Sequence, residues 1–305
     1  MKDAPVTTPS GVDVSELTAP RASSLFADYL ALTKPRLNFL VVVTSAAAYY
    51  LGATGAIDVI LMAQAVAGTA LVAGGAAVLN QLYERDTDAL MRRTRMRPLP
   101  DGRVTPSDAR TFGAVLSVTG LLLLALRTNW IAAALALATL VIYLVVYTPM
   151  KLRTPQSTLV GAIPGALPAI IGWTASHGSI APGGAALFAI VFLWQMPHFM
   201  AIAWLYRDDY GKAGFPMLPV IEPGGARAGR QALIYAALLV PVSLTPTLVG
   251  IAGAIYFWVA LVLGLALLGL AGRFAATRSE ASARALFFGS ITYLPLLWIA
   301  LVANH

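Results

Sequence analysis

The chain alternates between long stretches without charged residues and short segments that carry almost all of its charge. Asp, Glu, Lys and Arg are absent from seven stretches, which are 37–57, 59–83, 111–126, 128–150, 154–206, 231–272 and 285–305. A transmembrane helix needs about 20 apolar residues to cross the hydrocarbon layer. Five stretches therefore hold one helix each, and the two longest hold two each, separated at 176–184 and at 245–253. The pattern predicts an all-α protein with nine transmembrane helices.

Composition supports this interpretation and excludes a soluble protein. The 305 residues are 58% hydrophobic and 11% charged, with a mean hydropathy of +0.74. A soluble globular domain carries about 25% charged residues. We expect a polar N-terminal tail over residues 1–32 and a single transmembrane domain over 33–305. The tail lacks the apolar core of a secretory signal peptide. The absence of Cys excludes disulfide bonds and thiolate chemistry.

The distribution of positive charge predicts the orientation in the membrane. We sorted the 21 Lys and Arg residues by the loops between the nine predicted helices. Twenty of them fall on one side, and Arg127 is the single exception. Cytoplasmic loops retain an excess of Lys and Arg. We therefore expect the N-terminus to be cytoplasmic and the protein to lie in a bacterial cytoplasmic membrane. The net charge of +7 is explained by this topology and by anionic lipids, so no nucleic-acid partner is needed.

A polar stripe ends the second predicted helix. Asn80, Glu84 and Asp88 follow one another at intervals of four residues, so they share one face of a continuous helix. Their oxygen atoms suit Mg²⁺, which prefers carboxylates together with substrate phosphates. The alternative is a charged helix end in water, with Glu84 paired to arginines. We favour the metal site because an Asn in apolar sequence one turn deeper is costly unless it is used.

Basic residues follow this stripe directly and recur in the next loop on the same side. Four arginines lie within six residues, and two more cations come after the fourth predicted helix: Arg92, Arg93, Arg95, Arg97, Lys151 and Arg153. They could be topology signals only. Beside an acidic metal cluster, however, they complete a diphosphate site in which the cations and the metal share the phosphate charge. Pro149 and Pro155 bracket the later loop and should end both neighbouring helices there.

A second acidic pair, Asp208 and Asp209, lies at the cytoplasmic end of the sixth predicted helix. Two acidic clusters at one depth suggest a shared metal and diphosphate centre. His198 lies in the same helix, about 15 Å deeper at 1.5 Å per residue. An ionisable group at that depth is functional by default. It could bind a metal or heme, carry a proton, or only hydrogen-bond within the bundle.

Several segments resemble, in the expected order, the signatures of the UbiA superfamily of intramembrane prenyltransferases. They are Thr33-Lys-Pro-Arg36, Asn80-x-x-x-Glu-Arg-Asp-x-Asp88 with its arginine-rich continuation, Tyr147-Thr-x-x-Lys-x-Arg-Thr154, Gly165-Ala-x-Pro168, Trp194-Gln-x-Pro-His-Phe199 and Asp209-Tyr-x-x-Ala-Gly-x-Pro-Met-Leu218. Within the superfamily, Gln81, Glu84 and the Pro-His-Phe segment resemble the branch that farnesylates heme.

This resemblance implies a nine-helix bundle around a central cavity that binds Mg²⁺ and farnesyl diphosphate under a cytoplasmic cap. The implied reaction converts heme B, farnesyl diphosphate and water to heme O and diphosphate, with the lipid bilayer and the next enzyme of heme A synthesis as partners. Carried over residue by residue, the implied catalytic residues are Asn80, Glu84, Asp88, Lys151 and Asp209. The implied substrate-binding residues are Arg36, Arg92, Arg97, Tyr147, Arg153 and His198, and the metal ligands are Asn80, Glu84, Asp88, Asp208 and Asp209.

Two other functions compete with this interpretation. A related prenyltransferase could act on an aromatic quinone precursor, although Glu84 and the Pro-His-Phe segment argue against it. A transporter of an anionic lipid or a porphyrin could also combine acids and bases around a cavity. Transporters place their sites near the midplane, whereas the charged motifs here lie at one face. This placement favours an enzyme with a cap at the membrane surface.

Overall fold

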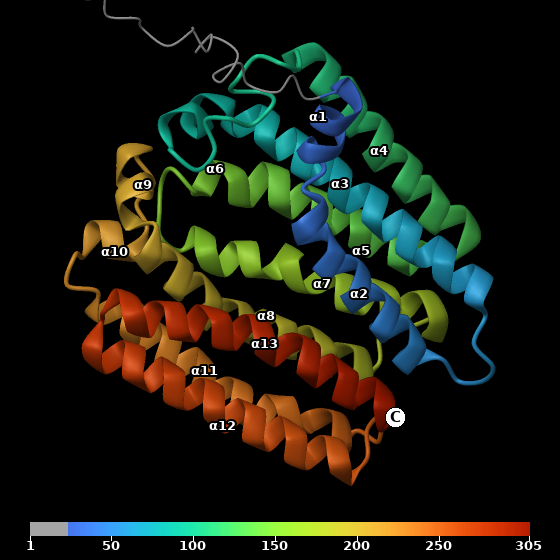
Figure 1. Ribbon diagram of the computed structural model, residues 1–305. Coiled ribbons are helices and arrows are strands. Elements are labelled where there is room, and N and C mark those ends of the chain that lie inside the picture. The colour runs from blue at the N-terminus through green and yellow to red at the C-terminus, as the bar shows by residue number, and fades with distance from the viewer. Residues whose placement is uncertain (1–23) are drawn as a thin grey trace, which may run out of the picture.

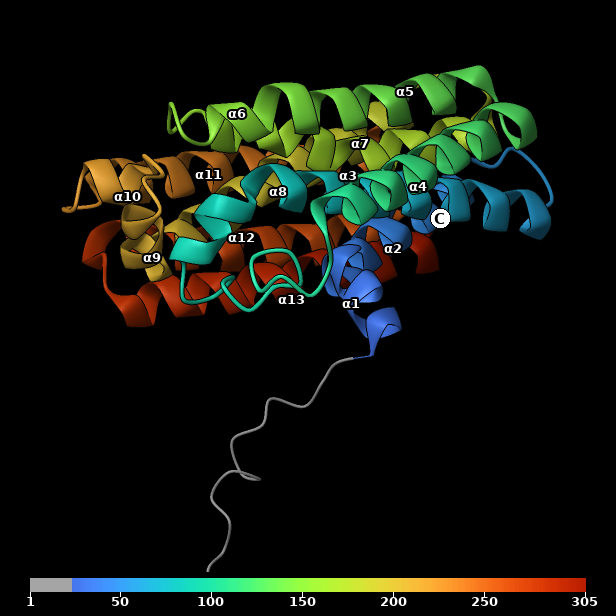
Figure 2. The ribbon, with the colours of Figure 1, turned by 90° about the horizontal axis from the view of Figure 1, so that it is seen from above.

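The computed structural model describes residues 24–305, and over this range all the regular secondary structure is helical (Figure 1). The long helices run side by side, and their ends form two opposite faces of the bundle (Figure 2). The helices are α1 (Leu25–Leu32), α2 (Pro35–Gly52), α3 (Val59–Leu90), α4 (Pro106–Arg127), α5 (Trp130–Val141), η1 (Ile142–Tyr147), α6 (Thr148–Met150), α7 (Ser157–His177), α8 (Pro182–Leu205), α9 (Arg207–Lys212), α10 (Leu218–Ile221), α11 (Ala226–Leu248), α12 (Ala254–Thr277) and α13 (Glu280–Ala303).

Eight helices of the described chain are long and apolar enough to cross a membrane, counting the continuous helix from α5 to α6 as one. They are α3, α4, α5 to α6, α7, α8, α11, α12 and α13. The α2 helix is not among the eight, and its first turn contains the polar residues Arg36 and Asn38. It packs along α3 and α7 within the bundle. The all-helical membrane fold is therefore confirmed, eight of the nine predicted spans are supported, and the span over α2 stays a prediction.

The breaks between helices lie where the sequence pattern placed them. The α7 helix ends at His177 and α11 ends at Leu248, both within the predicted breaks. At the break bracketed by prolines, the helix ends at Met150, one residue after Pro149, and α7 begins at Ser157, two residues after Pro155. The preceding turn widens into the π-helix η1, and the chain stays helical to Met150. A proline lacks the N–H that an α-helix needs at this point, and the wider turn accommodates that loss.

Small residues hold α3 and α4 at close range. A Cβ atom on Gly75 would lie 2.7 Å from the Gly113 carbonyl oxygen, and one on Gly120 would lie 2.6 Å from the Gly68 carbonyl oxygen. Helices in membranes commonly pack through such small residues, because the backbones can then approach closely. This contact fixes the position of α3, which carries the polar stripe.

We expect Gly75→Ala to destabilise the bundle, because the added methyl group would meet backbone of α4 that cannot move away alone. Overpacking of this kind costs about 1–3 kcal/mol. Gly269→Ala is the matched control, because it adds a methyl group to the helix α12 where no neighbouring atom lies within 4 Å. Thermal unfolding of the two purified variants in one detergent should show a lower midpoint for the first only. Equal midpoints would contradict the close α3–α4 contact.

Residues 24–32, which the sequence analysis assigned to a polar tail, include the helix α1, while residues 1–23 lie outside the described range. The α1 helix runs across the direction of the long helices (Figure 2). Asp28 of α1 pairs with Arg103 at 3.0 Å, and Gln81 of α3 donates a hydrogen bond to the Leu32 carbonyl oxygen at 2.6 Å. These two contacts fix the chain just before Lys34.

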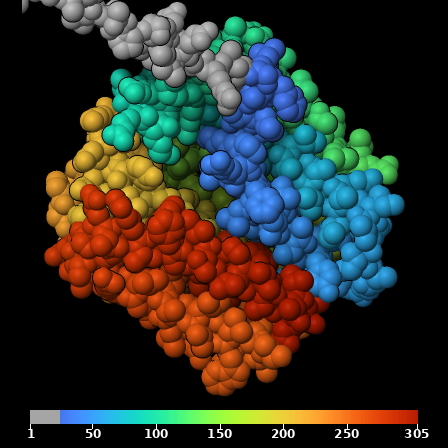
Figure 3. Space-filling view, viewed as in Figure 1, coloured from blue at the N-terminus to red at the C-terminus, as the bar shows by residue number. Residues whose placement is uncertain are grey.

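The space-filling view shows a hollow in one face of the bundle (Figure 3). Its rim is formed by α2 in blue, α13 in red and the loop after α3 in teal, and green atoms from the middle of the chain lie at its floor. The α2 and α13 helices make few contacts with each other. The predicted central cavity therefore has a counterpart in the structure, and it opens sideways between the first and the last of the long helices.

Candidate functional site

The polar stripe at the end of α3 is buried inside the bundle. The exposed fractions of Asn80, Glu84 and Asp88 are 0%, 8% and 1%. They lie on successive turns of one continuous helix, as the spacing predicts. Asp86, between them in sequence, points outward, and its side chain is 88% exposed. The direction of each side chain thus separates the buried acids of the stripe from an exposed surface acid on the same helix.

Each member of the stripe faces a cation from a different segment of the chain. The Lys151 ammonium lies 2.7 Å from Glu84 Oε1, and Arg97 Nη1 lies 2.6 Å from Asp88 Oδ2. The third cation is Lys34, whose Nζ donates to Asn80 Oδ1 at 3.1 Å. Charges buried at this depth are stable only when they are paired. The folded chain therefore gathers three cations around two carboxylates.

Lys34 is the site residue that the sequence analysis did not single out. Its backbone has φ +51°, a left-handed conformation that is uncommon for a residue other than glycine. Burial lowers the pKa of Lys34 to about 7, and the positive charges of Arg97 and Lys151 add to this effect. Arg36, the residue predicted from the same Thr-Lys-Pro-Arg segment, is exposed. Lys34 is therefore the residue of this segment that contacts the stripe, and the role of Arg36 stays a prediction.

The π-helix η1 forms one wall of the site. Its Tyr143 hydroxyl donates to Asn80 Oδ1 at 3.4 Å, and the Tyr147 ring centroid lies 4.7 Å from the Lys151 ammonium. Thr148, directly after η1, accepts a hydrogen bond from Asn80 Nδ2 at 3.1 Å. Single π-turns within helices often occur at functional sites. The sequence analysis found Tyr147 but not Tyr143, although the spacing of four residues places both on one face.

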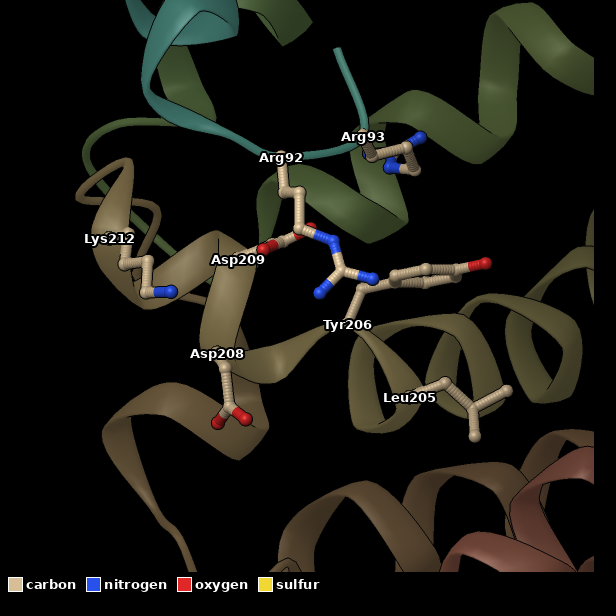
Figure 4. Close-up of a pocket in the computed structure, with 7 residues that line it drawn as sticks. All are labelled: Arg92, Arg93, Leu205, Tyr206, Asp208, Asp209 and Lys212. Atoms are coloured by element: carbon tan, nitrogen blue, oxygen red, sulfur yellow. The ribbon is translucent and has the colours of Figure 1, made fainter. Parts of the chain in front are cut away.

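A second polar cluster lies nearby, where the loop after α3 meets the end of α8. It lines a pocket of about 420 Å³ (Figure 4). The residues around this pocket are Arg92, Arg93, Leu205, Tyr206, Asp208, Asp209 and Lys212. The Arg93 guanidinium lies 5.3 Å from the Tyr206 ring centroid and 5.8 Å from that of Tyr210. The two predicted motifs therefore meet, as expected, at one end of the bundle.

The two acids of the second cluster diverge. Figure 4 shows Arg92 extending between Asp209 and Tyr206, whereas the Asp208 carboxylate points away from it. Asp208 is exposed and Asp209 is half-buried. Over residues 24–305 there is no group of three or more His, Asp or Glu side chains placed to hold one ion. The structure thus brings the two acidic motifs to one end without joining them into a single ligand set.

The other predicted residues occupy different surroundings. Arg153 is exposed in the loop after α6. His198 lies on α8 and faces α13, where its Nδ1 is 2.8 Å from the Ser290 hydroxyl. It is not in contact with the stripe on α3.

The donor atoms of the stripe fit a magnesium ion. Asn80, Glu84 and Asp88 offer only oxygen, which is what a hard cation prefers, and two of the three are carboxylates. Mg²⁺ commonly takes one or two carboxylates and completes its shell with substrate phosphates. The neighbouring cations Lys34, Arg97 and Lys151 match phosphate oxygens. In their chemistry, these residues fit a metal ion together with an anion better than a metal ion alone.

Solved structures share this architecture, and one of the two described below is bound to such ligands. A digeranylgeranylglyceryl phosphate synthase superposes with a TM-score of 0.78 at 17% identity, covering 92% of this chain and 98% of that chain. A UbiA homolog from Archaeoglobus fulgidus bound to GPP and Mg²⁺ superposes with a TM-score of 0.65 at 19% identity, covering 90% and 99%. At these identities the likeness establishes the fold alone.

Sequence relatives are much closer. The protoheme IX farnesyltransferase of Koribacter versatilis is 44% identical over 296 residues, covering 94% of this chain and 96% of that protein. The protein of the same name from Anaeromyxobacter sp. is 47% identical over 277 residues, covering 90% and 92%. The UbiA prenyltransferase family matches residues 41–294. Since this match spans most of the chain and includes every member of the polar stripe, the chain belongs to the UbiA prenyltransferase family.

Proposed function

We propose that the chain transfers the farnesyl group of farnesyl diphosphate to a vinyl group of heme B, with addition of water, and releases diphosphate. The product is heme O. Two observations support this proposal. The sequence relatives at 44–47% identity carry the name protoheme IX farnesyltransferase, and the chain contains the family's polar stripe in the form that has Glu84. Family membership favours prenyl transfer over the transport of a lipid or a porphyrin.

The observation that carries the proposal is the cluster of three cations around the buried stripe. Lys34, Arg97 and Lys151 come from separate segments and converge within 3.1 Å of the stripe. A purely structural cluster would need two cations for its two carboxylates. Lys34, whose pKa is lowered to about 7, adds a third positive charge that is only partly present in the empty site and that a bound anionic diphosphate would stabilise.

In this proposal Asn80, Glu84 and Asp88 hold Mg²⁺, with Asp208 and Asp209 as the acids available from the other side of the substrate. When bound, the metal would withdraw electron density from the diphosphate and so assist its departure. Lys151 and Arg97 would turn from the carboxylates towards phosphate oxygens, since guanidinium and ammonium groups bind phosphate strongly. Tyr147 and Arg92 would contact the substrate at the rim.

We also propose that the site lies at the cytoplasmic face of the membrane. Apart from Arg127 at the end of α4, the Lys and Arg residues within 24–305 lie at the end of the bundle that holds the site. Positive residues are retained on the cytoplasmic side. Residues 33–305 would act as one catalytic domain, and the apolar product would pass within the bilayer to a further membrane enzyme.

The test is an incubation of the purified protein in nanodiscs with heme B, farnesyl diphosphate and Mg²⁺, followed by mass spectrometry of the hemes. We expect a product heavier than heme B by one farnesyl group plus water. EDTA should remove this activity, and added Mg²⁺ should restore it, because the stripe lacks ligands for a closed metal site.

An aromatic acid offered in a parallel incubation is the control for the acceptor. Prenylation of that acid without any heme product would refute the proposed acceptor but not the family. Turnover that persists in EDTA would refute the role of the metal. Diphosphate release without any prenylated product would indicate hydrolysis.

A further inference from the structure

The imidazole of His198 is held in one tautomer. Its Nδ1 lies 2.8 Å from Ser290 Oγ, and the same Oγ donates its hydrogen to the Phe287 carbonyl oxygen at 2.7 Å. A serine has a single hydroxyl hydrogen. Since that hydrogen points to Phe287, Ser290 accepts from His198, and Nδ1 carries the proton. The other nitrogen, Nε2, therefore presents its lone pair.

The surroundings fix the direction of that lone pair. The ring of His198 stacks against Trp194 and Phe287, with centroid distances of 5.2 Å in both pairs. Trp194 is anchored in turn, because its Nε1 donates to the Ser290 carbonyl oxygen at 2.7 Å. Within residues 24–305, the Nε2 atom has no hydrogen-bond partner. It is also not one of the polar atoms in that range that are both buried and without a partner. It is thus accessible and free to act on a ligand.

Nε2 lies at the depth of the polar stripe. The ends of α3 and α8 meet where Arg93 packs on Tyr206. Glu84 precedes the end of α3 by six residues and His198 precedes the end of α8 by seven, which is about 9 Å and about 10 Å along the helices. The α8 helix contacts α2, α7, α11 and α13. His198 itself is half-buried on α8, so part of its ring stays accessible.

We propose that His198 Nε2 accepts the proton of the water molecule that completes the reaction, an inference that rests on the proposed function. The terminal vinyl carbon of heme bonds to C1 of the farnesyl group as the C1–O bond breaks, and its electron pair leaves with diphosphate. The positive charge then lies on the vinyl carbon attached to the porphyrin. Water adds through oxygen to that carbon, and one of its protons passes to Nε2, which later returns it to solvent.

The decisive variant is His198→Asn. The Asn amide nitrogen takes the place of Nδ1 and can still donate to Ser290, whereas the lone pair of Nε2 is removed. Without a base for water, the charged intermediate loses a proton from carbon instead and gives a product lighter by one water. We expect the ratio of hydrated to dehydrated farnesyl heme to fall at least about tenfold, since a positioned general base contributes about 10²–10⁴-fold.

His177→Asn is the matched control, because this histidine lies at the other end of the bundle, where its Nδ1 contacts the Gly52 carbonyl oxygen. Ser290→Ala keeps the imidazole but releases its tautomer, so we expect a smaller fall in the same ratio. This variant also decides the matter if His198→Asn fails to fold. An unchanged ratio in the folded variants would overturn the inference. The inference would also be overturned if His198→Asn kept the ratio of hydrated to dehydrated product but lost the spectrum of imidazole-ligated heme. That result would make His198 an iron ligand.

The same assay separates this inference from the proposed function. A wild-type protein that makes no farnesylated heme would refute the function and the role of His198 together. A wild-type protein that makes the hydrated product, beside a His198→Asn variant that makes it at the same rate, would refute the role of His198 alone.

Discussion

Glu84→Gln is expected to lower the rate of prenyl transfer by at least about 10³-fold while leaving the protein folded in the membrane. The amide has the shape of the carboxylate and can still accept a hydrogen bond from Lys151, which lies 2.7 Å from Glu84 Oε1. It lacks the negative charge that would bind the metal ion. Losing one preorganised electrostatic contact commonly costs 10²–10³-fold, and here both the metal and the placement of Lys151 depend on the same charge.

Asp86→Asn provides the control for this variant. It removes a carboxylate from the same turns of α3, but that carboxylate is 88% exposed and faces away from the site. Its turnover should match the wild type. Product formation by each variant is measured under saturating substrates, with the elution profile in detergent as the check of folding. Normal turnover in Glu84→Gln would refute the metal assignment, whatever the control shows.

Asp88→Asn should be equally inactive and less stable than the wild type. Asp88 is 1% exposed, and Arg97 approaches it at 2.6 Å. Removing one partner of a buried ion pair leaves the other charge unpaired, which costs about 3–5 kcal/mol. Glu84→Gln leaves Lys151 without its carboxylate in the same way, so the unfolding midpoints of both variants are measured beside their turnover, and both should lie below that of the wild type.

Lys34→Met is expected to lower kcat/KM for farnesyl diphosphate about 10²-fold. The substitution keeps the length and apolar stem of the side chain but removes the ammonium, whose Nζ lies 3.1 Å from Asn80 Oδ1. This ammonium is the cation in excess over the two carboxylates of the stripe, so its loss should weaken the binding of the anionic substrate.

Arg36→Gln is the comparison that makes the Lys34 result specific. Both cations belong to the Thr-Lys-Pro-Arg segment, yet Arg36 is exposed on the first turn of α2. Its kcat/KM should stay within about threefold of the wild type, because an exposed charge in water contributes little. Initial rates over a range of farnesyl diphosphate concentrations measure both variants. A larger loss in Arg36→Gln than in Lys34→Met would reverse the assignment.

Much of the fold followed from the sequence because lipid imposes one simple rule. Backbone polar groups in the bilayer core must be satisfied within the segment, so long charge-free stretches form helices. The breaks after His177 and after Leu248 fell inside the predicted intervals for this reason. The π-helix η1 before Pro149 did not follow from the pattern, and it lies where Tyr143 and Thr148 contact Asn80 on another helix.

The candidate site, like the fold, followed from the sequence only in part. The sequence alone determined that Asn80, Glu84 and Asp88 share one face of a helix, since their spacing matches the helical period. Only the tertiary structure decided which cations reach them. Along the chain, Lys34 lies 46 residues from Asn80 and Lys151 lies 67 residues from Glu84. Nothing in their local sequence shows that they turn inward while Arg36 and Arg153 remain exposed. The helical period decides toward which side of its own helix a side chain points. Which side chains from different helices meet depends on how the whole bundle packs.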